Sequence, residues 1–403
     1  MDKKVKELAE KYKKDIINFA VKMIKTPSFS TKEGDLVRLI EKEMIICGFD
    51  KVKIDKMGNI LGFIGNGKMK VMLDAHIDTV GVGDPKEWKI KPFEGIIKDN
   101  KIWGRGASDQ KLSMVSMVYA GKIIKELGLA NKYTYIAVGS VQEEDCDGLP
   151  ILHIVNKEKI KPDYVILTEP TNLSVYRGHR GRMEIKITVK GKSCHASAPE
   201  RGDNALFKMS HIIQEVTKLN EKLKNDHFLG KGTIAVTYEE SKTPSLNAIP
   251  DEAVIYLDRR LTKGEDKDLA IKQIKNLPSV KKYKAKVEIL NYEATSWKGL
   301  KVKQEKYFPT WVLEEKHHLV QSAIKAANFA LEKKPKVGKW VFSTNGVASA
   351  GRLGIPSVGF GPANEIYAHS VNEQMPISDL IKATVFYSVI GSFIVEHKDL
   401  NKN

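Results

Sequence analysis

Side chains that could bind a metal or move a proton follow a short apolar segment at residues 71–80, which reads Val-Met-Leu-Asp-Ala-His-Ile-Asp-Thr-Val. The apolar part is short enough for a buried strand, and open α/β sheets bind ligands beyond the carboxyl ends of their strands. His76 and Asp78 are one residue apart, so in an extended chain both side chains point to the same side. This pair predicts a metal ligand with its supporting partner, an acid–base pair, or a polar strand end that hydrogen-bonds a turn.

Further acidic and imidazole residues follow other segments of the same kind. They are Asp109 after the Gly-containing residues 104–107, Glu143 and Glu144 after the strand-like residues 133–140, Glu169 after the apolar residues 164–168, and His369 after the Gly-rich residues 359–361. Histidines and carboxylates together are a ligand set that suits zinc, or cobalt or manganese. An excess of carboxylates favours two adjacent cations bridged by one Asp, with one acid left free to take a proton from water.

Each of these residues, taken alone, also has a purely structural explanation. Asp109 could cap the helix that the spacing of Leu112, Val115 and Val118 predicts. An adjacent pair of glutamates usually lies on a solvated surface, and a Glu before a Pro is usually a loop residue. A single histidine in a loop usually makes hydrogen bonds within that loop. All of them, however, stand at the ends of apolar, strand-like segments, and this shared placement favours a common site over coincidence.

Composition excludes several other classes of protein. The chain has 403 residues, 42% apolar and 29% charged, which is typical of a soluble enzyme with two domains. The net charge is +16, but the lysines are spread singly along the chain, so we expect no nucleic-acid partner. We find no membrane-spanning window and no signal-peptide segment, and we expect no membrane partner. Three scattered cysteines, Cys47, Cys146 and Cys194, predict a reduced, cytoplasmic protein.

The order of the predicted elements indicates an α/β fold with an insertion. Strand-like and helical segments alternate first, which favours a mainly parallel sheet covered by helices on both faces. Residues 183–189 then alternate between apolar and polar, as in a half-exposed strand, and the α/β pattern resumes near Leu300. We therefore expect residues 1–181 and 295–403 to form one catalytic domain, with residues 182–294 as an inserted α+β domain. We also predict a strand at residues 340–342 and a long ordered loop at residues 298–316.

The motifs together resemble the zinc-dependent aminoacylase and carboxypeptidase family, which includes acetylornithine deacetylase, succinyl-diaminopimelate desuccinylase and glutamate carboxypeptidase. The matching segments are His76-Ile-Asp78-Thr-Val80, Gly104-Arg-Gly-Ala-Ser-Asp109-Gln-Lys111, Glu143-Glu144, Glu169-Pro170 and Ala368-His369-Ser370, in the family's order. The resemblance implies two zinc ions per chain. One would be bound by His76 and Glu169 and the other by Glu144 and His369, with Asp109 bridging them. Asp78 would orient His76, and Glu143 would be the general base.

The inserted domain resembles the lid and dimerisation domain of the same family. The segment Gly191-Lys-Ser-Cys194-His195-Ala-Ser197-Ala-Pro199 matches a histidine motif, and this resemblance implies that His195 binds the oxyanion of the tetrahedral intermediate. Its alternative is a turn histidine. Asn247-Ala-Ile-Pro250 and Asp258-Arg259-Arg260 match substrate-binding positions, so Asn247 and Arg260 are expected to bind substrate, with Arg259 as a competing candidate. The resemblance also implies a homodimer through paired lids, in which each His195 reaches the partner's site.

The predicted activity is hydrolysis of the amide bond of an N-acyl or N-carbamoyl amino acid. The alternative is a dipeptidase or carboxypeptidase acting on small peptides with a free C-terminal carboxylate. Glu169, where tripeptidase-like relatives carry Asp, favours acylases and carboxypeptidases. Asp145 and Asn345 depart from the residues most common in the family, Glu and Asp, and leave the substrate open. Residues 142–148 and 177–182 are similar to a branch called selenium-metabolism-linked hydrolases.

Overall fold

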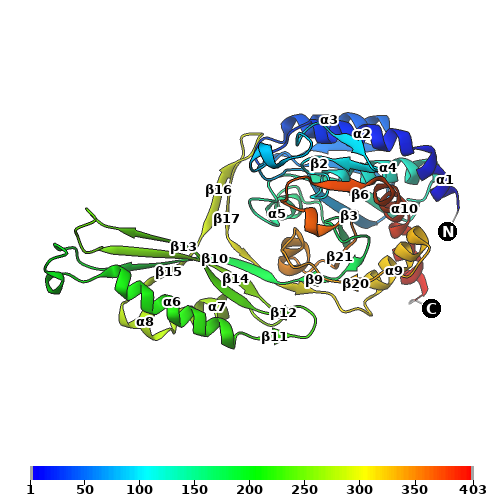
Figure 1. Ribbon diagram of the computed structural model, residues 1–403. Helices are drawn as coiled ribbons and strands as arrows, with labels where there is room; N and C mark the ends of the chain where they lie inside the picture. Colours follow the sequence, from blue (N-terminus) through cyan, green and yellow to red (C-terminus); the bar gives the residue numbers. More distant parts are fainter. Residues whose placement is uncertain (1–2, 401–403) are drawn as a thin grey trace.

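A mixed sheet of eight strands forms the centre of the larger domain in the computed structural model, which describes residues 3–400 and the side chains of residues 3–397 (Figure 1). In spatial order the strands are β1 (Lys51–Ile54), β2 (Ile60–Ile64), β6 (Tyr133–Ser140), β3 (Met69–His76), β7 (Tyr164–Leu167), β21 (Ser357–Gly359), β8 (Val175–Tyr176) and β20 (Val337–Gly338). The four neighbours β6, β3, β7 and β21 are parallel, so their carboxyl ends meet at one edge. The predicted α/β class with a mainly parallel central sheet is confirmed.

Helices cover both faces of this sheet because successive strand residues point to opposite sides. Val71 and Leu73 of β3 belong to one core, while Met72 between them belongs to the other. The first core includes α1 (Lys4–Lys11), α2 (Lys13–Lys25), α3 (Gly34–Ile46), α4 (Lys111–Leu127), α9 (His318–Leu331) and α10 (Ile377–Leu400). The second includes α5 (Leu149–Asn156) and the helical turn η3 (Val347–Arg352). Both faces of the parallel strands are therefore buried, and the open edge remains for function.

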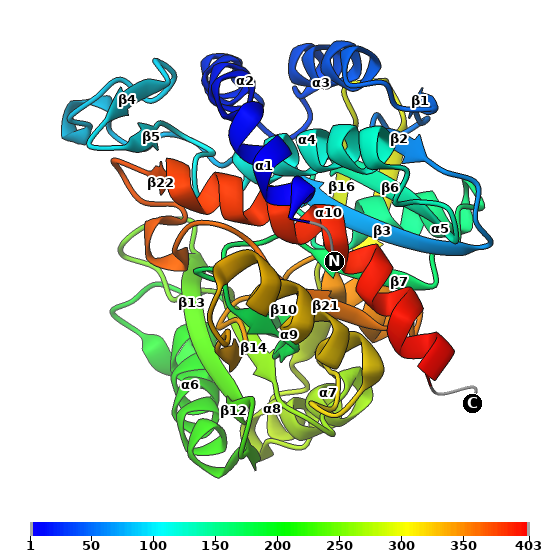
Figure 2. The ribbon, with the colours of Figure 1, turned by 90° about the vertical axis from the view of Figure 1, so that its right-hand side faces the viewer.

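The sequence analysis found no segment that could span a membrane, but helix α10 is long and apolar enough to do so. Residues 377–397 are long and apolar enough to cross one, with a mean hydropathy of 1.4. In the structure, however, α10 packs against α4, α9 and α1 as a central helix of the larger domain (Figure 2). Its apolar composition is explained by these neighbours, which bury 61% of the window.

The inserted domain is a second sheet with helices on one face (Figure 1). Its antiparallel strands run in the order β13 (Thr233–Lys242), β14 (Glu252–Leu261), β10 (Gly181–Lys190) and β15 (Lys286–Ile289), and β18 (Tyr307–Phe308) also pairs with β10. Every second residue of β10 is buried, from Gly181 to Val189, as the alternation in sequence predicts. The buried side chains pack against α6 (Ala205–Lys222), α7 (Lys267–Lys275) and α8 (Pro278–Lys282), which form a separate core. A short hairpin of β11 (Asn225–Asp226) and β12 (Gly230–Lys231) lies at its side.

Two predictions for the last third of the chain are wrong. Residues 298–316 were expected as a loop, but they contain β17 (Lys301–Glu305), β18 and β19 (Trp311–Val312). Strand β17 pairs with β16 (Asn291–Thr295) in a ribbon that links the two domains, and β19 pairs with β9 (Gly178–His179). The polar residues of β16 and β17 pair as a narrow two-stranded ribbon, and β18 and β19 have only two residues each, so no apolar pattern marks them. Residues 340–342 were expected as a strand, but the strand is β20 and Trp340 is instead a buried residue of the second core.

A small sheet brings two distant loops together beside the open edge. Its strands are β22 (Gln374–Pro376), β5 (Lys101–Trp103) and β4 (Ile96–Lys98). Because β5 pairs with β22, the loop that follows β5 and the loop that precedes β22 lie side by side. These two loops contain Asp109 and His369.

Candidate active site

His76 is the last residue of β3 and lines a cavity at the carboxyl edge of the sheet. Its Nδ1 lies 3.0 Å from the main-chain oxygen of Asp78. Because a carbonyl oxygen only accepts hydrogen bonds, this contact places a hydrogen on Nδ1 and directs Nε2 at the surrounding carboxylates. Nε2 lies 2.9 Å from Asp109 Oδ1 and 3.6 Å from Glu169 Oε1.

The Asp78 carboxylate supports a different part of the site from the one predicted. It lies 3.6 Å from His76 Nδ1, farther away than the Asp78 carbonyl oxygen. Its oxygens accept hydrogen bonds from the main-chain N–H groups of Glu143 and Glu144, each at 3.2 Å. Asp78 therefore orients His76 mainly through its backbone and fixes the turn of the two glutamates through its side chain. That turn begins at Gln142, whose φ of 58° directs the chain away from β6.

Asp109 is held by Glu373 and does not cap α4. The N-cap residue of α4 is Gln110, and its own side chain makes no capping hydrogen bond with the described residues of the helix. The buried Glu373 carboxylate accepts hydrogen bonds from the N–H groups of Asp109, Ser108 and Gly106, at 2.7 to 2.9 Å. The loop is thus fixed by the segment that follows His369, and the Asp109 carboxylate is left to face the cavity.

The two oxygens of Asp109 face two different histidines. Oδ1 lies 2.9 Å from His76 Nε2, and Oδ2 lies 3.3 Å from His369 Nε2. His369 Nε2 is also 2.8 Å from Glu144 Oε2. The backbone of His369 has a φ of 57°, an uncommon conformation for a residue with a side chain and one that occurs often at functional sites. Asp109 thus lies between two clusters, each with one histidine.

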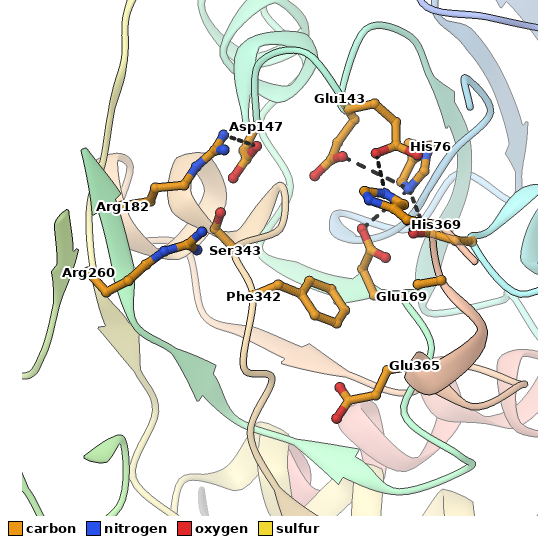
Figure 3. Close-up of a pocket in the computed structure, with 13 residues that line it drawn as sticks. His76, Glu143, Asp147, Glu169, Arg182, Arg260, Phe342, Ser343, Glu365 and His369 are labelled. Carbon is orange, nitrogen blue, oxygen red and sulfur yellow. Dashed lines mark hydrogen bonds and ion pairs between the residues drawn. The ribbon is translucent and has the colours of Figure 1, made fainter. Parts of the chain in front are cut away.

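A cavity of about 440 Å³ opens from this cluster (Figure 3). Figure 3 shows the histidines, Glu143 and Glu169 on one side and Asp147, Arg182 and Arg260 on the other. Phe342, Ser343 and Glu365 complete the lining. A polar cavity with two charged walls suits a small substrate with polar groups at both ends.

Most of the chain matches one family model. The model of peptidase family M20/M25/M40 matches residues 72–390, a range that contains every residue of the cluster. The chain belongs to peptidase family M20/M25/M40. It is therefore a hydrolase, and the family predicted from the motifs is confirmed.

Individual relatives agree with this membership of the M20 family. The chain is 50% identical over 388 residues to the uncharacterised protein YgeY of Escherichia coli K12, with 96% of each protein covered. It is 25% identical to a succinyl-diaminopimelate desuccinylase of Buchnera aphidicola, with 93% of this chain and 97% of that protein covered. The aminopeptidase PepT of Bacillus cereus has the same fold, with a TM-score of 0.74 at 20% identity over 95% of this chain and 99% of that one.

The cluster of this M20 hydrolase concentrates negative charge in a buried place. Burial raises the pKa values of the Glu143 and Glu169 carboxyl groups well above their usual range. Burial would also raise the pKa of Asp109, but hydrogen bonds from His369 and His76 outweigh it and lower that pKa. The contacts with Asp109 and Glu144 in turn raise the pKa of His369 to about 10. The carboxyl and imidazole groups thus shift one another's pKa values because they share protons. Divalent metal cations can take the place of those protons.

The donor atoms of this M20 site fit divalent metal ions. One group joins His76, Asp109 and Glu144, and a second joins His76, Glu143 and Glu169, with the ligand atoms of each group within 4.8 Å of one another. Glu144 Oε1 is buried and has no hydrogen-bond partner among the side chains and backbone that the structure describes. Imidazole nitrogen with several carboxylate oxygens is a set that zinc, cobalt and manganese accept. Glu143 is thus close enough to His76 and Glu169 to reach a metal as well as a metal-bound water.

His195 and Asn247 lie apart from the other predicted site residues. Both are exposed at the far end of the inserted domain, where His195 forms a β-bridge with Ala248. Strand β10 leads there from the cavity through ten residues, which corresponds to about 30 Å. Within one chain, the structure therefore brings together His76, Asp109, Glu144, Glu169, His369 and Glu143, but not His195 or Asn247.

The competing candidates Arg259 and Arg260 occupy different environments. Arg260 lines the cavity. Arg259 is fully buried, and its Nη2 lies 2.5 Å from Glu265 Oε1 on the other side of the sheet. Arg260 is already paired with Asp258, through Nε–Oδ1 at 2.7 Å and Nη2–Oδ2 at 3.0 Å. The guanidinium edge of Arg260 that remains for a substrate is the one formed by its two terminal nitrogens.

Asn345, which departs from the Asp common in the family, lies behind the cavity wall. Its amide donates to Asp74 Oδ2 and Ser140 Oγ, at 2.8 and 3.1 Å, and its oxygen accepts from the N–H of Gly148 at 2.7 Å. It therefore ties its loop to β3, β6 and α5, while Phe342 and Ser343 of the same loop reach the cavity.

Sequence reasoning missed four polar residues of the site. Glu373 lies four residues after His369, and Asp147 lies three residues after Glu144, so both were close to recognised motifs. Arg182 is the second residue of β10, and it was noted only within residues 177–182, not as a site residue. Glu365 had no signal in the sequence.

Proposed function

We propose that this M20 hydrolase binds two zinc ions and cleaves the amide bond of an N-acyl or N-carbamoyl amino acid. The observation that carries this proposal is the placement of Asp109 between two histidines, with Glu143 Oε2 3.9 Å from His76 Nε2. One carboxylate that faces two ligand groups is the arrangement that a bridged metal pair requires. Cobalt or manganese are alternative occupants. The second candidate activity is that of a dipeptidase or carboxypeptidase.

The residues of the chain divide the work of amide hydrolysis among them. Zinc ions bound by the cluster would polarise the substrate carbonyl and acidify the attacking water. Glu143 would accept the proton of that water and pass it to the leaving nitrogen, a transfer that its buried and raised carboxyl pKa favours. Asp78 and Glu373 would keep the glutamate turn and Asp109 in place through main-chain hydrogen bonds.

A first prediction concerns metal content. The purified protein, reconstituted with zinc, should contain close to two ions per chain and should lose its activity on chelation. Elemental analysis combined with an activity assay would check this, with add-back of zinc, cobalt or manganese as the control. Full activity at one ion per chain would contradict the bridging role of Asp109.

A second prediction concerns the substrate carboxylate and Arg260. The variant Arg260→Lys should lower kcat/KM for the free acid at least about tenfold, because an ammonium cannot replace two parallel guanidinium hydrogen bonds. The methyl ester of the same substrate should be a poor substrate for the wild type and should be little affected by the substitution. Equal wild-type rates on acid and ester would remove Arg260 from substrate binding.

The decisive test of the proposed activity is a substrate screen. The zinc-loaded protein would be incubated with N-acetyl, N-succinyl and N-carbamoyl amino acids and with dipeptides, and released amino groups would be measured. Release from the acylated compounds supports the deacylase, whereas release from dipeptides alone supports the second candidate. No hydrolysis of any compound by the fully metallated protein would overturn both.

We also propose that the protein works in the reducing cytoplasm. Cys47 and Cys146 are buried, Cys194 is partly exposed, and all three are free thiols. Alkylation of protein isolated rapidly from cells, followed by mass spectrometry, should find all three thiols unoxidised. A cysteine recovered in a disulfide would contradict this placement.

A further inference from the structure

A further group of possible metal ligands lies outside the active site, around helix α5. It contains Asp55, which follows β1, His153 on α5, and Glu158, which is two residues beyond the end of α5. One ligand atom of each residue lies within 4.8 Å of the other two. None of the three lines the active-site cavity, so the metal pair proposed there does not account for this group.

The imidazole of His153 is aimed between the two carboxylates without a hydrogen bond to either. Its side chain is only 10% exposed, and its Nε2 is buried with no hydrogen-bond partner among the described residues. Nε2 lies 3.5 Å from Glu158 Oε1 and 4.0 Å from Asp55 Oδ2. A histidine N–H normally has its acceptor at about 2.7–3.2 Å. Two ligands about 2.1 Å from a zinc ion lie about 3.4 Å apart in tetrahedral geometry, which is close to the shorter of these distances.

The Asp55 carboxylate is fixed by donors other than His153. Its Oδ1 accepts hydrogen bonds from the N–H groups of Gly58 and Asn59, at 2.8 and 3.0 Å, and its Oδ2 accepts from the Asn59 amide at 2.7 Å. A rotation of this carboxylate toward His153 would break these bonds. The gap between Asp55 and His153 is therefore held open by the turn that follows β1.

The Glu158 carboxylate is fixed in a similar way and leaves one oxygen for a further contact. Its Oε2 is paired with the Lys53 ammonium, and this hydrogen bond lowers the pKa of Glu158 and keeps the group ionised. Its Oε1, which faces His153, has only a long contact of 3.5 Å with the N–H of Lys56. One charged oxygen therefore remains beside the unpaired imidazole nitrogen.

A cavity beside α5 can complete the coordination of an ion. Its volume is about 690 Å³, and both His153 and Glu158 line it. Three protein ligands and one water from the cavity make a four-coordinate site. One imidazole nitrogen with carboxylate oxygens is a ligand set that zinc and cobalt accept.

We propose that Asp55, His153 and Glu158 bind a third divalent ion, zinc, in addition to the pair in the active site. The ion links the end of β1 to α5. It binds more weakly than the active-site pair, because the Lys53 ammonium offsets part of the negative charge of Glu158. The site therefore fills only in the presence of free metal, and the content of about two ions per chain expected after removal of excess metal does not change.

The test is a metal titration of protein that already contains its two tightly bound zinc ions. Zinc would be added in a calorimeter, and cobalt(II) would be added with its visible absorption as a second readout. The wild type should show one further binding step per chain. His153→Ala and Glu158→Gln should each weaken this step at least about tenfold, because even the loss of an outer-shell partner has that effect.

Two measurements show that these variants are intact. Both should retain the two tightly bound ions and the wild-type kcat/KM, because neither residue lines the active-site cavity. The matched control for the histidine is His227→Ala. His227 also lies near a carboxylate, with Nδ1 3.9 Å from Asp226 Oδ2, but its side chain is 92% exposed, so its loss should leave the further step unchanged.

A substitution that strengthens the site gives the sharpest test. Lys53→Met removes the ammonium from Glu158 and should tighten the binding of the third ion about three- to tenfold. The matched control is Lys51→Met, which removes the same charge two residues earlier on β1, where the ammonium lies over the Phe63 ring. If His153 only completes an ion pair with the two carboxylates, neither substitution creates or improves a metal site.

Three outcomes would overturn the proposal. The first is the absence of a further binding step in the wild type and in Lys53→Met at free zinc well above the concentration that saturates the active site. The second is a step of unchanged affinity in His153→Ala, which would mean adventitious binding elsewhere. The third is weaker binding in Lys53→Met than in Lys51→Met.

Discussion

Replacement of Glu143 by alanine should leave the metal content of the protein unchanged and lower kcat by at least about 100- to 10,000-fold, the contribution of a general base. The neighbouring variant, Glu144→Ala, should instead weaken one metal site selectively, because Glu144 belongs to one ligand group, with His76 and Asp109, and its Oε2 contacts His369. Elemental analysis and kcat measured on both variants would check the pair of expectations. Because the two residues are adjacent on one turn, each variant is the control for the other.

The position of Glu143 makes the comparison of these two variants informative. Glu143 lies in one of the two ligand groups that share His76, together with Glu169. If Glu143 is a metal ligand, Glu143→Ala should lose a metal ion. If Glu143 only transfers protons, Glu143→Ala should keep both ions. If Glu143→Ala lost a metal and Glu144→Ala kept both, the assigned roles would be off by one residue.

The second large effect is expected for His195. We propose that the protein is a homodimer through its inserted domains and that His195 of each chain completes the partner's site. Three exposed apolar side chains of this domain, Phe207, Tyr238 and Leu246, agree with such an interface, and Leu246 is 99% exposed. The N–H of Ser197 donates to His195 Nδ1 at 3.2 Å, so a neutral His195 carries its hydrogen on Nε2 and can donate it to an oxyanion.

Homodimers of Glu143→Ala and of His195→Ala should both be nearly inactive. A hybrid dimer should contain one complete site, with Glu143 from one chain and His195 from the other. After random exchange in equal amounts, half of the dimers are hybrids with one good site of two, and the mixture should regain about a quarter of wild-type activity. Activity would be measured before and after exchange, with mixing of differently tagged chains as proof of exchange.

Two results would contradict this arrangement. One is a failure to recover activity although exchange is demonstrated, which would place the action of His195 within its own chain or remove it from catalysis. The other is a monomer in solution with full activity. The variant Ser197→Ala removes the hydroxyl that lies 2.7 Å from His195 Nδ1 but keeps the imidazole and the N–H donor, so it should lower activity less than His195→Ala does.

The ligand cluster could be predicted from the sequence because each residue stands at the end of an apolar strand. His76, Glu143 and Glu169 follow β3, β6 and β7, three neighbouring parallel strands, so their assembly follows from the α/β pattern alone. The bounds of β6 and β7 also agree closely with the expected residues 133–140 and 164–168, because their apolar segments are nearly continuous. Asp109 and His369 needed the family motif, since the pairing of β5 with β22 that unites their loops leaves no mark in either segment.

The opposite wall could not be predicted because its residues lie in unrelated segments. Asp147 is in a turn, Arg182 is near the start of β10, and Arg260 is near the end of β14. They meet only because β10 pairs with β14 in antiparallel register, which brings Arg182 opposite Arg260. The linking ribbon of β16 and β17 was missed for a related reason, since its polar residues carry no signal for a core. In both cases long-range strand register, and not local composition, decides the structure.

The unbroken strand β10 acts as a lever arm between the two ends of the inserted domain. Arg182 is its second residue and lies at the cavity, and the loop that contains His195 follows its far end. A swing of the domain by about 10° would move that far end by about 5 Å but would move Arg182 by less than about 1 Å. The wall that recognises a substrate can thus remain fixed while the tip of the domain travels. With the roles proposed for Arg260 and His195, substrate binding and placement of the oxyanion donor would therefore be separate movements.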